Sequence, residues 1–479
     1  MPNADPATTL AEMLGFHIEH FGCRAARADG EAIARNLRSL SEREPFAADV
    51  VIVNTCSVTA EADRAARAFI RRAHRRNPAA KIVVTGCYAQ RAPEELAAMA
   101  GVAAVVGNSH KALAPAIIRE LTRGGGFADA LPTALVPVTS LVAASAAQAP
   151  IWADDRFAHS FIEETLTGET QLAPGAQTRP NLKIQEGCGN RCTFCVIPQT
   201  RGPSKSLPYA VVMRRVEGFV AAGGKELVLS GINLGMWGRD LEGPDRRNLA
   251  GLVRNILVQT ELPRMRLSSI EPMDWSGELT ALLREFGGSR LARHAHLPLQ
   301  SASDAVLRRM HRRYRPWHYA EKVAALLDAA GPDLTLGADV MVGFPGETDC
   351  EFEETQAFIR ALPFGYLHLF PFSPRPDTRA WALHAVDPVA AWVVEERMAA
   401  LRALAAEKSA THRWRFVGRT LEAITLHTPA ELAGRRSTAA LTENFLPVEL
   451  EGSFEANRLM RLRVTGLNAK GELRACASA

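Results

Sequence analysis

The sequence contains no long uninterrupted apolar run, and no segment approaches the roughly 20 apolar residues that a membrane-spanning helix requires. The nearest segment, 131–150, is interrupted by Thr, Ser and Gln. The first residues also lack a basic stretch followed by an apolar core, so we expect no signal peptide. These absences predict a cytoplasmic protein without a membrane partner.

Neither sign of charge dominates, because 56 Lys and Arg residues stand against 52 Asp and Glu residues, for a net charge of +4. The distribution of arginine is more informative than this average. Arginines crowd two segments, Arg64, Arg67, Arg71, Arg72, Arg75 and Arg76 in one and Arg308, Arg309, Arg312, Arg313 and Arg315 in the other. Such clusters suit phosphate binding, since each neutralised phosphate releases counterions, while a solvated helix face is the alternative for each.

Length and composition predict a globular chain of more than one domain. A chain of 479 residues is too long for one ordinary core, so we expect two to four domains. Hydrophobic residues make up 47% and charged residues 23%, which is typical of a soluble globular protein.

Cysteine is scarce, with 8 residues in the whole chain. Without a secretory signal, we expect these thiols to stay reduced and available to metals instead of forming disulfides. Three of them, Cys188, Cys192 and Cys195, form a Cys-x3-Cys-x2-Cys run after an apolar strand. Thiolate sulfur is the preferred ligand of iron–sulfur clusters. Three ligands on a four-iron cube leave one iron open, and that iron can chelate S-adenosylmethionine and pass it an electron. A zinc knuckle or unrelated core thiols are the alternatives, although zinc sites usually show two paired ligand sets.

Three further cysteines, Cys23, Cys56 and Cys87, each follow an apolar strand, about one strand–helix–strand unit apart. The carboxyl ends of parallel strands open on one edge of a sheet, so these thiols can meet in space. Each alone would most often be an inert buried residue. The shared position of all three, directly after a strand, favours a second three-thiolate cluster. Cys350 and Cys476 do not occupy such a position, and we interpret them as structural or incidental.

Strand and helix signals alternate through most of the chain, which predicts parallel sheets covered by helices. In the first third, strands are expected at 16–21, 49–53, 81–85 and 102–106, and helices at 31–40, 59–76 and 93–99. From residue 182 the rhythm returns, with strands at 182–185, 226–229, 264–268, 294–298, 335–342 and 366–370 and helices at 210–222, 304–310, 319–330 and 350–362. Six β/α units indicate an incomplete barrel with its site at the carboxyl ends of the strands.

The remaining segments connect or follow these units. Residues 123–180 are rich in Ala, Thr and Pro and read as a linker with one strand or hairpin. A long helix is expected at 389–415, followed by short strands at 421–426, 447–451 and 462–465 that fit a small β-barrel.

The motifs resemble the radical S-adenosylmethionine superfamily, and within it the methylthiotransferases. Phe194 occupies the aromatic position before the last cysteine of the superfamily motif. Further family motifs are the runs 54–58, 85–89, 184–187, 196–202, 229–235, 268–272, 296–301, 342–348 and 442–448, the last similar to the RNA-binding TRAM domain. The resemblance implies an N-terminal α/β domain at 12–125, a linker at 126–173, a radical SAM core at 174–406 and a TRAM-like barrel at 407–475. One departure is Ala26, where the family usually has Asn.

The resemblance also implies the chemistry and the partners. Two [4Fe–4S] clusters are expected, one on Cys188, Cys192 and Cys195 that cleaves S-adenosylmethionine to a 5′-deoxyadenosyl radical, and an auxiliary one on Cys23, Cys56 and Cys87 that holds the sulfur. The radical would remove hydrogen from C2 of adenine, and a methylthio group would take its place. Family resemblance further implies a low-potential electron donor and a sulfur source, neither of which the sequence identifies.

Candidate contacts to S-adenosylmethionine lie at the ends of the expected strands. They are Phe194, Gly231, Asn233, Glu271 and Gln300, each of which is also compatible with an ordinary cap or turn role. We expect their side chains or backbone to approach the adenine, ribose or methionine part of the cofactor.

Three branches of the family differ in substrate. One modifies isopentenyladenosine in tRNA, one modifies N6-threonylcarbamoyladenosine next to the anticodon, and one modifies an aspartate of a ribosomal protein. The runs 54–59, 85–90 and 185–187 look most like the threonylcarbamoyladenosine branch, with the tRNA anticodon loop as partner. The ribosomal-protein branch more often has Gly-Phe where this chain has Ser57-Val58. A non-catalytic iron–sulfur RNA-binding protein is the alternative from another class.

Overall fold

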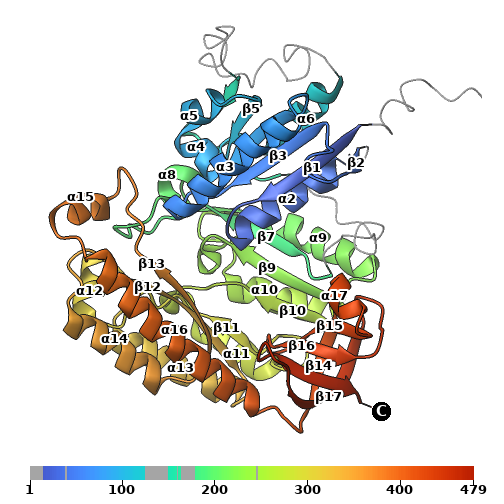
Figure 1. The fold of residues 1–479 in the computed structure, drawn as a ribbon. Coiled ribbons are helices and arrows are strands. Elements are labelled where there is room, and N and C mark those ends of the chain that lie inside the picture. The colour runs from blue at the N-terminus through green and yellow to red at the C-terminus, as the bar shows by residue number, and fades with distance from the viewer. Residues whose placement is uncertain are drawn as a thin grey trace, which may run out of the picture.

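The computed structural model describes residues 14–37, 40–123, 149–158, 160–162, 178–243 and 246–478. Figure 1 shows an N-terminal sheet domain in blue, a central set of strands and helices from green to orange, and a small red barrel at the C-terminal end. Within these described residues, no helix is both long and apolar enough to cross a membrane.

The N-terminal domain is a six-stranded parallel sheet in the order β2-β1-β3-β4-β5-β6. Its strands are β1 (Gly15–His20), β2 (Ser41–Glu42), β3 (Val50–Thr55), β4 (Lys81–Gly86), β5 (Val102–Gly107) and β6 (Ile151–Trp152). Its helices are α2 (Arg24–Asn36), α3 (Ala60–Arg76), α4 (Cys87–Arg91), α5 (Pro93–Ala97) and α6 (Ala114–Arg123). One apolar cluster joins α2 and α6 to the sheet and another joins α3, α4 and α5, so helices cover both faces. The predicted doubly wound sheet is confirmed.

Local sequence signals predicted the start of α3 correctly but not the start of α2. Thr59 caps α3 by accepting a hydrogen bond from the Ala62 N–H, as its predicted start requires. The start expected for the first helix, at residue 31, is wrong by about two turns, because α2 begins at Arg24. Gly30 lies inside α2, where a Cβ would come within 2.1 Å of the His20 ring. Close packing therefore explains this glycine in the middle of a helix.

The expected linker is only partly within the described residues, and 124–148 and 163–177 lie outside them. Its one described strand, β6, pairs with β5 through Val105 and Val106 and closes the edge of the N-terminal sheet. This part of the segment therefore packs as a piece of the N-terminal domain. The domain boundaries remain predictions.

The central domain carries six parallel strands in chain order. They are β7 (Asn181–Glu186), β9 (Glu226–Gly231), β10 (Arg264–Leu267), β11 (His294–His296), β12 (Thr335–Val342) and β13 (Phe364–Pro371), with the short antiparallel β8 (Lys205–Ser206) beside β7. They form two hydrogen-bonded sheets, which a bridge from Met265 to Leu291 and the Ile270 N–H bond to the His296 carbonyl (3.1 Å) connect. The expected incomplete barrel is confirmed.

Helices cover the outer face of this barrel. They are α9 (Tyr209–Ala221), α10 (Leu249–Gln259), α11 (Gly277–Phe286), α12 (Asp304–Arg309), α13 (Pro316–Ala330), α14 (Asp349–Ala361) and α16 (Ala391–Trp414), with the shorter α8 (Ile197–Arg201) and α15 (Arg379–Val386) near the N-terminal domain. Apolar strand residues such as Leu229, Leu267 and Val340 pack with the helices in one core cluster. Successive side chains of a strand point to opposite faces, so the residues between them face the inside of the barrel.

The C-terminal domain is a closed five-stranded barrel in the order β14-β15-β16-β18-β17. Its strands are β14 (Thr420–Thr425), β15 (Ser437–Thr442), β16 (Pro447–Glu451), β17 (Leu459–Leu467) and β18 (Leu473–Ala477), with α17 (Ala430–Ala433) between the first two. It has its own apolar core. The sequence predicted the barrel but located neither β15 nor β18.

Candidate metal centres and the charged network between them

The three N-terminal cysteines come together at one edge of the sheet. Strands β1, β3 and β4 are neighbours, and Cys23, Cys56 and Cys87 follow them at their carboxyl ends. Gly22 packs against Cys56, since a Cβ on Gly22 would lie 2.7 Å from the Cys56 Cβ. Cys56 and Cys87 are buried, while Cys23 is exposed at the start of α2. The three thiols therefore lie at one edge of the sheet, as their positions after the strands predicted.

Donors surround the sulfur atoms of this group. Arg201 Nε lies 3.3 Å and Asn108 Nδ2 3.4 Å from the Cys87 Sγ. Burial, and then the neighbouring thiols of Cys87 and Cys23, raise the pKa of the Cys56 thiol to about 12. Thiols that raise one another's pKa in this way would be held as thiolates by a bound metal.

Ala26, the position of the family departure, lies in the first turn of α2 and is buried. Its carbonyl accepts a 2.5 Å hydrogen bond from the Asn54 side chain, two residues before Cys56. A side-chain amide is thus present beside this group, supplied by β3 and not by position 26.

The second cysteine group lies in the loop after β7. Cys192 Sγ accepts a hydrogen bond from Arg312 Nη1 at 3.1 Å, and Cys188 Sγ accepts one from the Asn190 N–H at 3.4 Å. Burial, partly offset by the Ile197 N–H, raises the pKa of the Cys195 thiol to about 12, and the other two thiols add to this rise. These three sulfur atoms therefore also share one site.

The predicted S-adenosylmethionine contacts surround this loop to different degrees. Asn233 Nδ2 lies 3.9 Å from Cys188 Sγ, and Gly231 ends β9 two residues before it. Glu271 is ion-paired with Arg312, the residue that contacts Cys192. Glu271 and Arg312 both line an open pocket of about 610 Å³ that also includes Cys192. This pocket is next to the cysteine loop and carries both charges.

Gln300 and Phe194 lie differently. Gln300 has a left-handed backbone (φ 61°), is buried, and its Oε1 has no hydrogen-bond partner among the described residues. The Asn233 Oδ1 also has no hydrogen-bond partner among the described residues. Buried polar atoms without a partner are rare and mark places where a ligand can supply one. Phe194 packs its ring against the apolar cluster that contains Met310 and Phe344.

The arginine-rich segment 308–315 mostly contacts carboxylates of the protein itself. Arg309 pairs with Glu351 at 2.7 Å, and Arg315 pairs with Asp304 at 2.9 Å. Arg312 is buried and faces Cys192 and Glu271. Arg308 and Arg313 stay exposed beside the open pocket, at 62% and 47% of their side-chain surface. The sequence alone did not reveal the contact between Arg312 and a cysteine.

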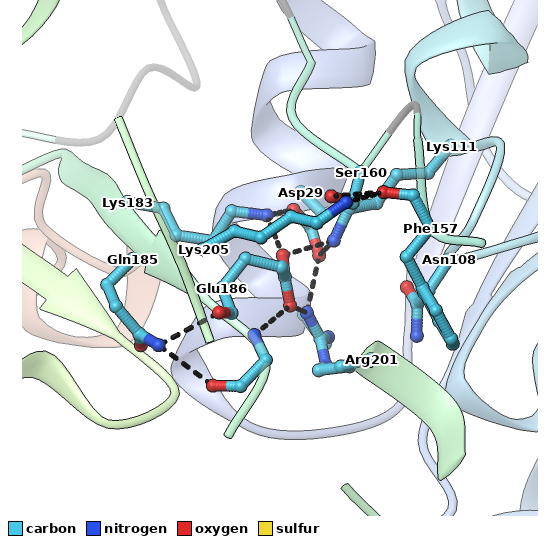
Figure 2. A network of polar contacts seen from close by, with 12 residues as sticks. Asp29, Asn108, Lys111, Phe157, Ser160, Lys183, Gln185, Glu186, Arg201 and Lys205 are labelled. Carbon is cyan, nitrogen blue, oxygen red and sulfur yellow. Dashed lines mark hydrogen bonds and ion pairs between the residues drawn. The ribbon is translucent and has the colours of Figure 1, made fainter. Parts of the chain in front are cut away.

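A buried network of five charged side chains joins the N-terminal and central domains (Figure 2). Its members are Asp29 and Lys111 of the N-terminal domain and Lys183, Glu186 and Arg201 of the central domain. Arg201 Nη1 lies 2.6 Å from Glu186 Oε1 and 3.1 Å from Asp29 Oδ2, and Lys183 Nζ lies 2.6 Å from Glu186 Oε2. Burial opposes the charge on Glu186, but Arg201, Lys111 and Lys183 hold the pKa of that carboxyl well below its usual range.

The network contacts the first cysteine group and precedes the second one in the chain. Arg201 contacts Cys87, as described above, and Glu186 stands two residues before Cys188. Sequence reasoning missed these residues. The available signal was the presence of two charged residues, Lys183 and Glu186, in a strand that is buried along nearly its whole length.

Comparison with known proteins agrees with this architecture. Residues 182–359 match the Radical SAM superfamily, and residues 15–107 match the Uncharacterized protein family UPF0004. The fold resembles that of the radical S-adenosylmethionine methyltransferase TsrM from Kitasatospora setae, with a TM-score of 0.55, 14% identity and 77% of each chain covered. Fold and cysteine motif together define a radical S-adenosylmethionine enzyme.

Comparison with curated relatives shows which kind of radical S-adenosylmethionine enzyme this chain resembles. The threonylcarbamoyladenosine tRNA methylthiotransferase MtaB of Bacillus subtilis is 34% identical over 92% of this chain and 90% of its own length. MtaB of Aquifex aeolicus is 32% identical over 93% of this chain and 99% of its own length. The tRNA-2-methylthio-N(6)-dimethylallyladenosine synthase of Erythrobacter litoralis is 33% identical, with 86% of each chain covered. The chain belongs to the family of MtaB-like tRNA methylthiotransferases, which confirms the resemblance drawn from its motifs. A [4Fe–4S] cluster, S-adenosylmethionine and a tRNA substrate are implied by this membership.

Proposed function

We propose that this chain adds a methylthio group to C2 of N6-threonylcarbamoyladenosine (t6A) in the anticodon loop of tRNA. The C2 hydrogen leaves with one S-adenosylmethionine as 5′-deoxyadenosine, and a second S-adenosylmethionine supplies the methyl group on sulfur. The observation that carries the proposal is the pair of three-cysteine groups, each with an arginine donor on one of its sulfur atoms. The similarity to MtaB proteins over nine-tenths of the chain supports the choice of t6A.

Cys188, Cys192 and Cys195 would hold the radical SAM cluster, and Cys23, Cys56 and Cys87 would hold the auxiliary one. The residues fit these groups, since Arg312 and Arg201 place positive charge on one thiol of each set. When bound, the first cluster would supply the electron for cofactor cleavage, and the second would hold the sulfur that is transferred.

The residues of the protein position the reactants. Asn233 and Gln300 offer buried side-chain oxygens that have no hydrogen-bond partner within the described part of the chain, which suits the amino and hydroxyl groups of S-adenosylmethionine. Glu271 is held by Arg312, so its carboxylate is oriented at the edge of the pocket beside Cys192. The charged network fixes the N-terminal domain on the central domain, so the two cysteine groups keep one separation.

The C-terminal barrel and the exposed arginines of α3 suit RNA and not a folded ribosomal protein. Anticodon-loop bases can be splayed out, which makes C2 of adenine accessible as it is not in a paired helix. An electron donor and a sulfur source of unidentified nature complete the reaction.

Activity of the anaerobically reconstituted protein with S-adenosylmethionine, dithionite and tRNA tests this function. We expect 5′-deoxyadenosine and, by nucleoside mass spectrometry, the 2-methylthio derivative of t6A. Replacing Cys23, Cys56 and Cys87 by Ala should halve the iron content, preserve cofactor cleavage and abolish methylthiolation. Cys350→Ala with Cys476→Ala is the matched control, since both cysteines lie outside the two groups, and it should change neither iron content nor activity.

The outcomes separate the alternatives. Absence of 5′-deoxyadenosine from iron-loaded protein would leave the RNA-binding iron–sulfur protein as the better interpretation. Product on isopentenyladenosine but not on t6A would assign the chain to the other tRNA branch. Full iron retention in the triple variant would mean that those three thiols are not ligands.

A further inference from the structure

Three polar side chains meet on the inner face of the strands β11, β12 and β13. His296 Nε2 and His368 Nδ1 lie 3.3 Å and 3.2 Å from the same oxygen, Oδ1 of Asp339. Burial opposes the charge on Asp339, but the two histidines that face it hold the pKa of this carboxyl well below its usual range. Asp339 therefore orients both imidazole rings, and the second nitrogen of each ring is left for another partner.

The arrangement fits hydrogen bonding better than metal binding. The ligand atoms of the three residues all lie within 4.8 Å of one another, which is close enough to hold an ion. However, His368 Nδ1 lies at hydrogen-bond distance (3.2 Å) from the Asp339 oxygen that His296 Nε2 also faces, and a metal would have to displace this contact. The two rings and the carboxylate therefore offer a polar surface to an organic ligand.

Aromatic rings continue this surface toward the C-terminal barrel. The Tyr366 ring lies 5.9 Å from that of His296 and 5.6 Å from that of Phe445. Phe445 follows β15 and belongs to the C-terminal barrel, and its ring is 4.3 Å from that of His294. Proteins that bind unpaired bases stack them on such rings.

The position of the polar cluster suits one end of a substrate base. Asp339 and His368 each stand three residues before the last residue of their strands, Val342 and Pro371, so they lie roughly 10 Å below the strand ends at about 3.3 Å per residue. The Gln300 N–H bonds to the Asp339 carbonyl at 2.7 Å, which places the cluster directly beside a candidate cofactor contact. C2 and the N6-bearing C6 flank N1 on one edge of the adenine ring, and the threonylcarbamoyl group extends from N6 well beyond the ring. A base that lies along the inner face of the barrel with C2 near the strand ends can therefore reach the cluster with its N6 substituent.

We propose that His296, Asp339 and His368 bind the N6 substituent of the substrate and select a threonylcarbamoyl group over an isopentenyl group. This inference rests on the proposed function. A threonylcarbamoyl group carries amide, hydroxyl and carboxylate groups that can bond the free imidazole nitrogens. An isopentenyl group carries none of these and would leave the polar side chains without partners, which such sites reject strongly. The His368 side chain is 55% exposed, so an incoming nucleotide can reach it.

Kinetics on two synthetic anticodon stem-loops, one with t6A and one with isopentenyladenosine, test this inference. In His368→Leu, we expect kcat/KM for the t6A stem-loop to fall about tenfold, mainly through KM, while the isopentenyladenosine stem-loop reacts as before or faster. His368→Gln keeps a hydrogen-bonding group and should recover most of the loss. His318→Leu, on the outer helix α13, is the matched control and should leave the ratio of the two rates unchanged.

Each result bears on a different statement. If the unaltered protein does not modify t6A, the proposed function fails and this inference fails with it. If it does, and His368→Leu keeps the original preference, only this inference is overturned. A stoichiometric divalent metal beyond the iron, lost in His368→Leu, would also overturn it, because the cluster would then be a metal site.

Discussion

At the scale of single residues, Arg201 has the most informative environment of the charged side chains described above. It is fully buried, it donates to Cys87 from Nε and to Glu186 and Asp29 from Nη1, and these partners come from both domains. Burial opposes its charge, but Cys87 and then the two carboxylates keep the pKa of the guanidinium well above its usual range. A fixed positive charge next to a thiolate ligand is one of the factors that set the potential of an iron–sulfur cluster.

Removing this charge should shift the auxiliary cluster. In Arg201→Gln, we expect its midpoint potential to become more negative, because a nearby cation favours the reduced, more negative form of the cluster. A tenfold change in the reduction equilibrium corresponds to about 59 mV for one electron, and a shift of about that size is expected in a potentiometric titration followed by electron paramagnetic resonance. Arg201→Lys keeps the charge and should shift the potential less.

A suitable control is Arg397→Gln. Arg397 is also buried in an ion pair, with Glu347 at 3.0 Å, but no described contact joins it to a cysteine. Its replacement should leave the potential unchanged even if it lowers stability. Equal potentials in unaltered protein and Arg201→Gln would show that Arg201 has only a structural role.

The residue scale also shows what sequence can and cannot supply. The cysteines of both groups could be predicted, since chain spacing reveals one group and strand phase reveals the other. The partners of their sulfur atoms could not, because Arg201 and Arg312 reach Cys87 and Cys192 from segments 114 and 120 residues away. Arg312 even stood in a segment whose arginines suggested RNA contact.

At the scale of elements, the strand β17 shows how a period-two pattern sets both a core and a binding surface. Leu462 and Val464 are buried in the C-terminal barrel, and Arg461 and Arg463, which alternate with them, are exposed. The sequence predicted this strand from its alternation. The basic outer face of β17 became evident only in the structure. The same is true of the strands β15 and β18, which flank β16, because short strands with Ala and Thr carry little periodic signal.

We expect this outer face of β17 to contact tRNA phosphates. Changing Arg461 and Arg463 together to Gln should weaken tRNA binding and reduce the slope of log K against log salt by about 0.7–0.9 for each lost phosphate contact. Filter binding or fluorescence anisotropy at several salt concentrations measures both quantities. Cofactor cleavage in the absence of RNA should be unaffected, since β17 is remote in sequence and domain from both cysteine groups.

Exposed arginines on the outer helices of the central domain provide the comparison. Arg254 of α10 and Arg284 of α11 pair with Glu285 and Asp328 and lie outside the C-terminal barrel. Their double replacement by Gln should leave the salt slope as it was. An equal loss in both double variants would indicate a general effect of net charge, and the tRNA surface would have to lie elsewhere.

At the scale of the whole molecule, charged contacts join the central domain to both of its neighbours. Asp29, Lys111, Lys183, Glu186 and Arg201 link the N-terminal and central domains, and all five side chains are buried. On the other side, Arg293 pairs with Glu443 at 2.6 Å and Arg419 with Asp333 at 2.6 Å, which attaches the C-terminal barrel. Buried ion pairs of this kind contribute little to stability as compared with apolar packing, but losing one partner is costly because it leaves a buried charge uncompensated.

The two interfaces should therefore open independently. Asp29→Asn leaves three buried cations facing one carboxylate, Glu186, and should weaken the N-terminal interface by about 3–5 kcal/mol. In hydrogen–deuterium exchange at neutral pH, we expect faster exchange in α2 and in the loop after β7, with the C-terminal barrel unchanged. Asp333→Asn is the matched control, because it removes a carboxylate at the other interface, and it should expose β14 while leaving α2 protected. If Asp29→Asn left α2 as protected as before, the network would not be what holds the two cysteine groups at a fixed separation, and that separation would have to come from the contacts between α4 and α8.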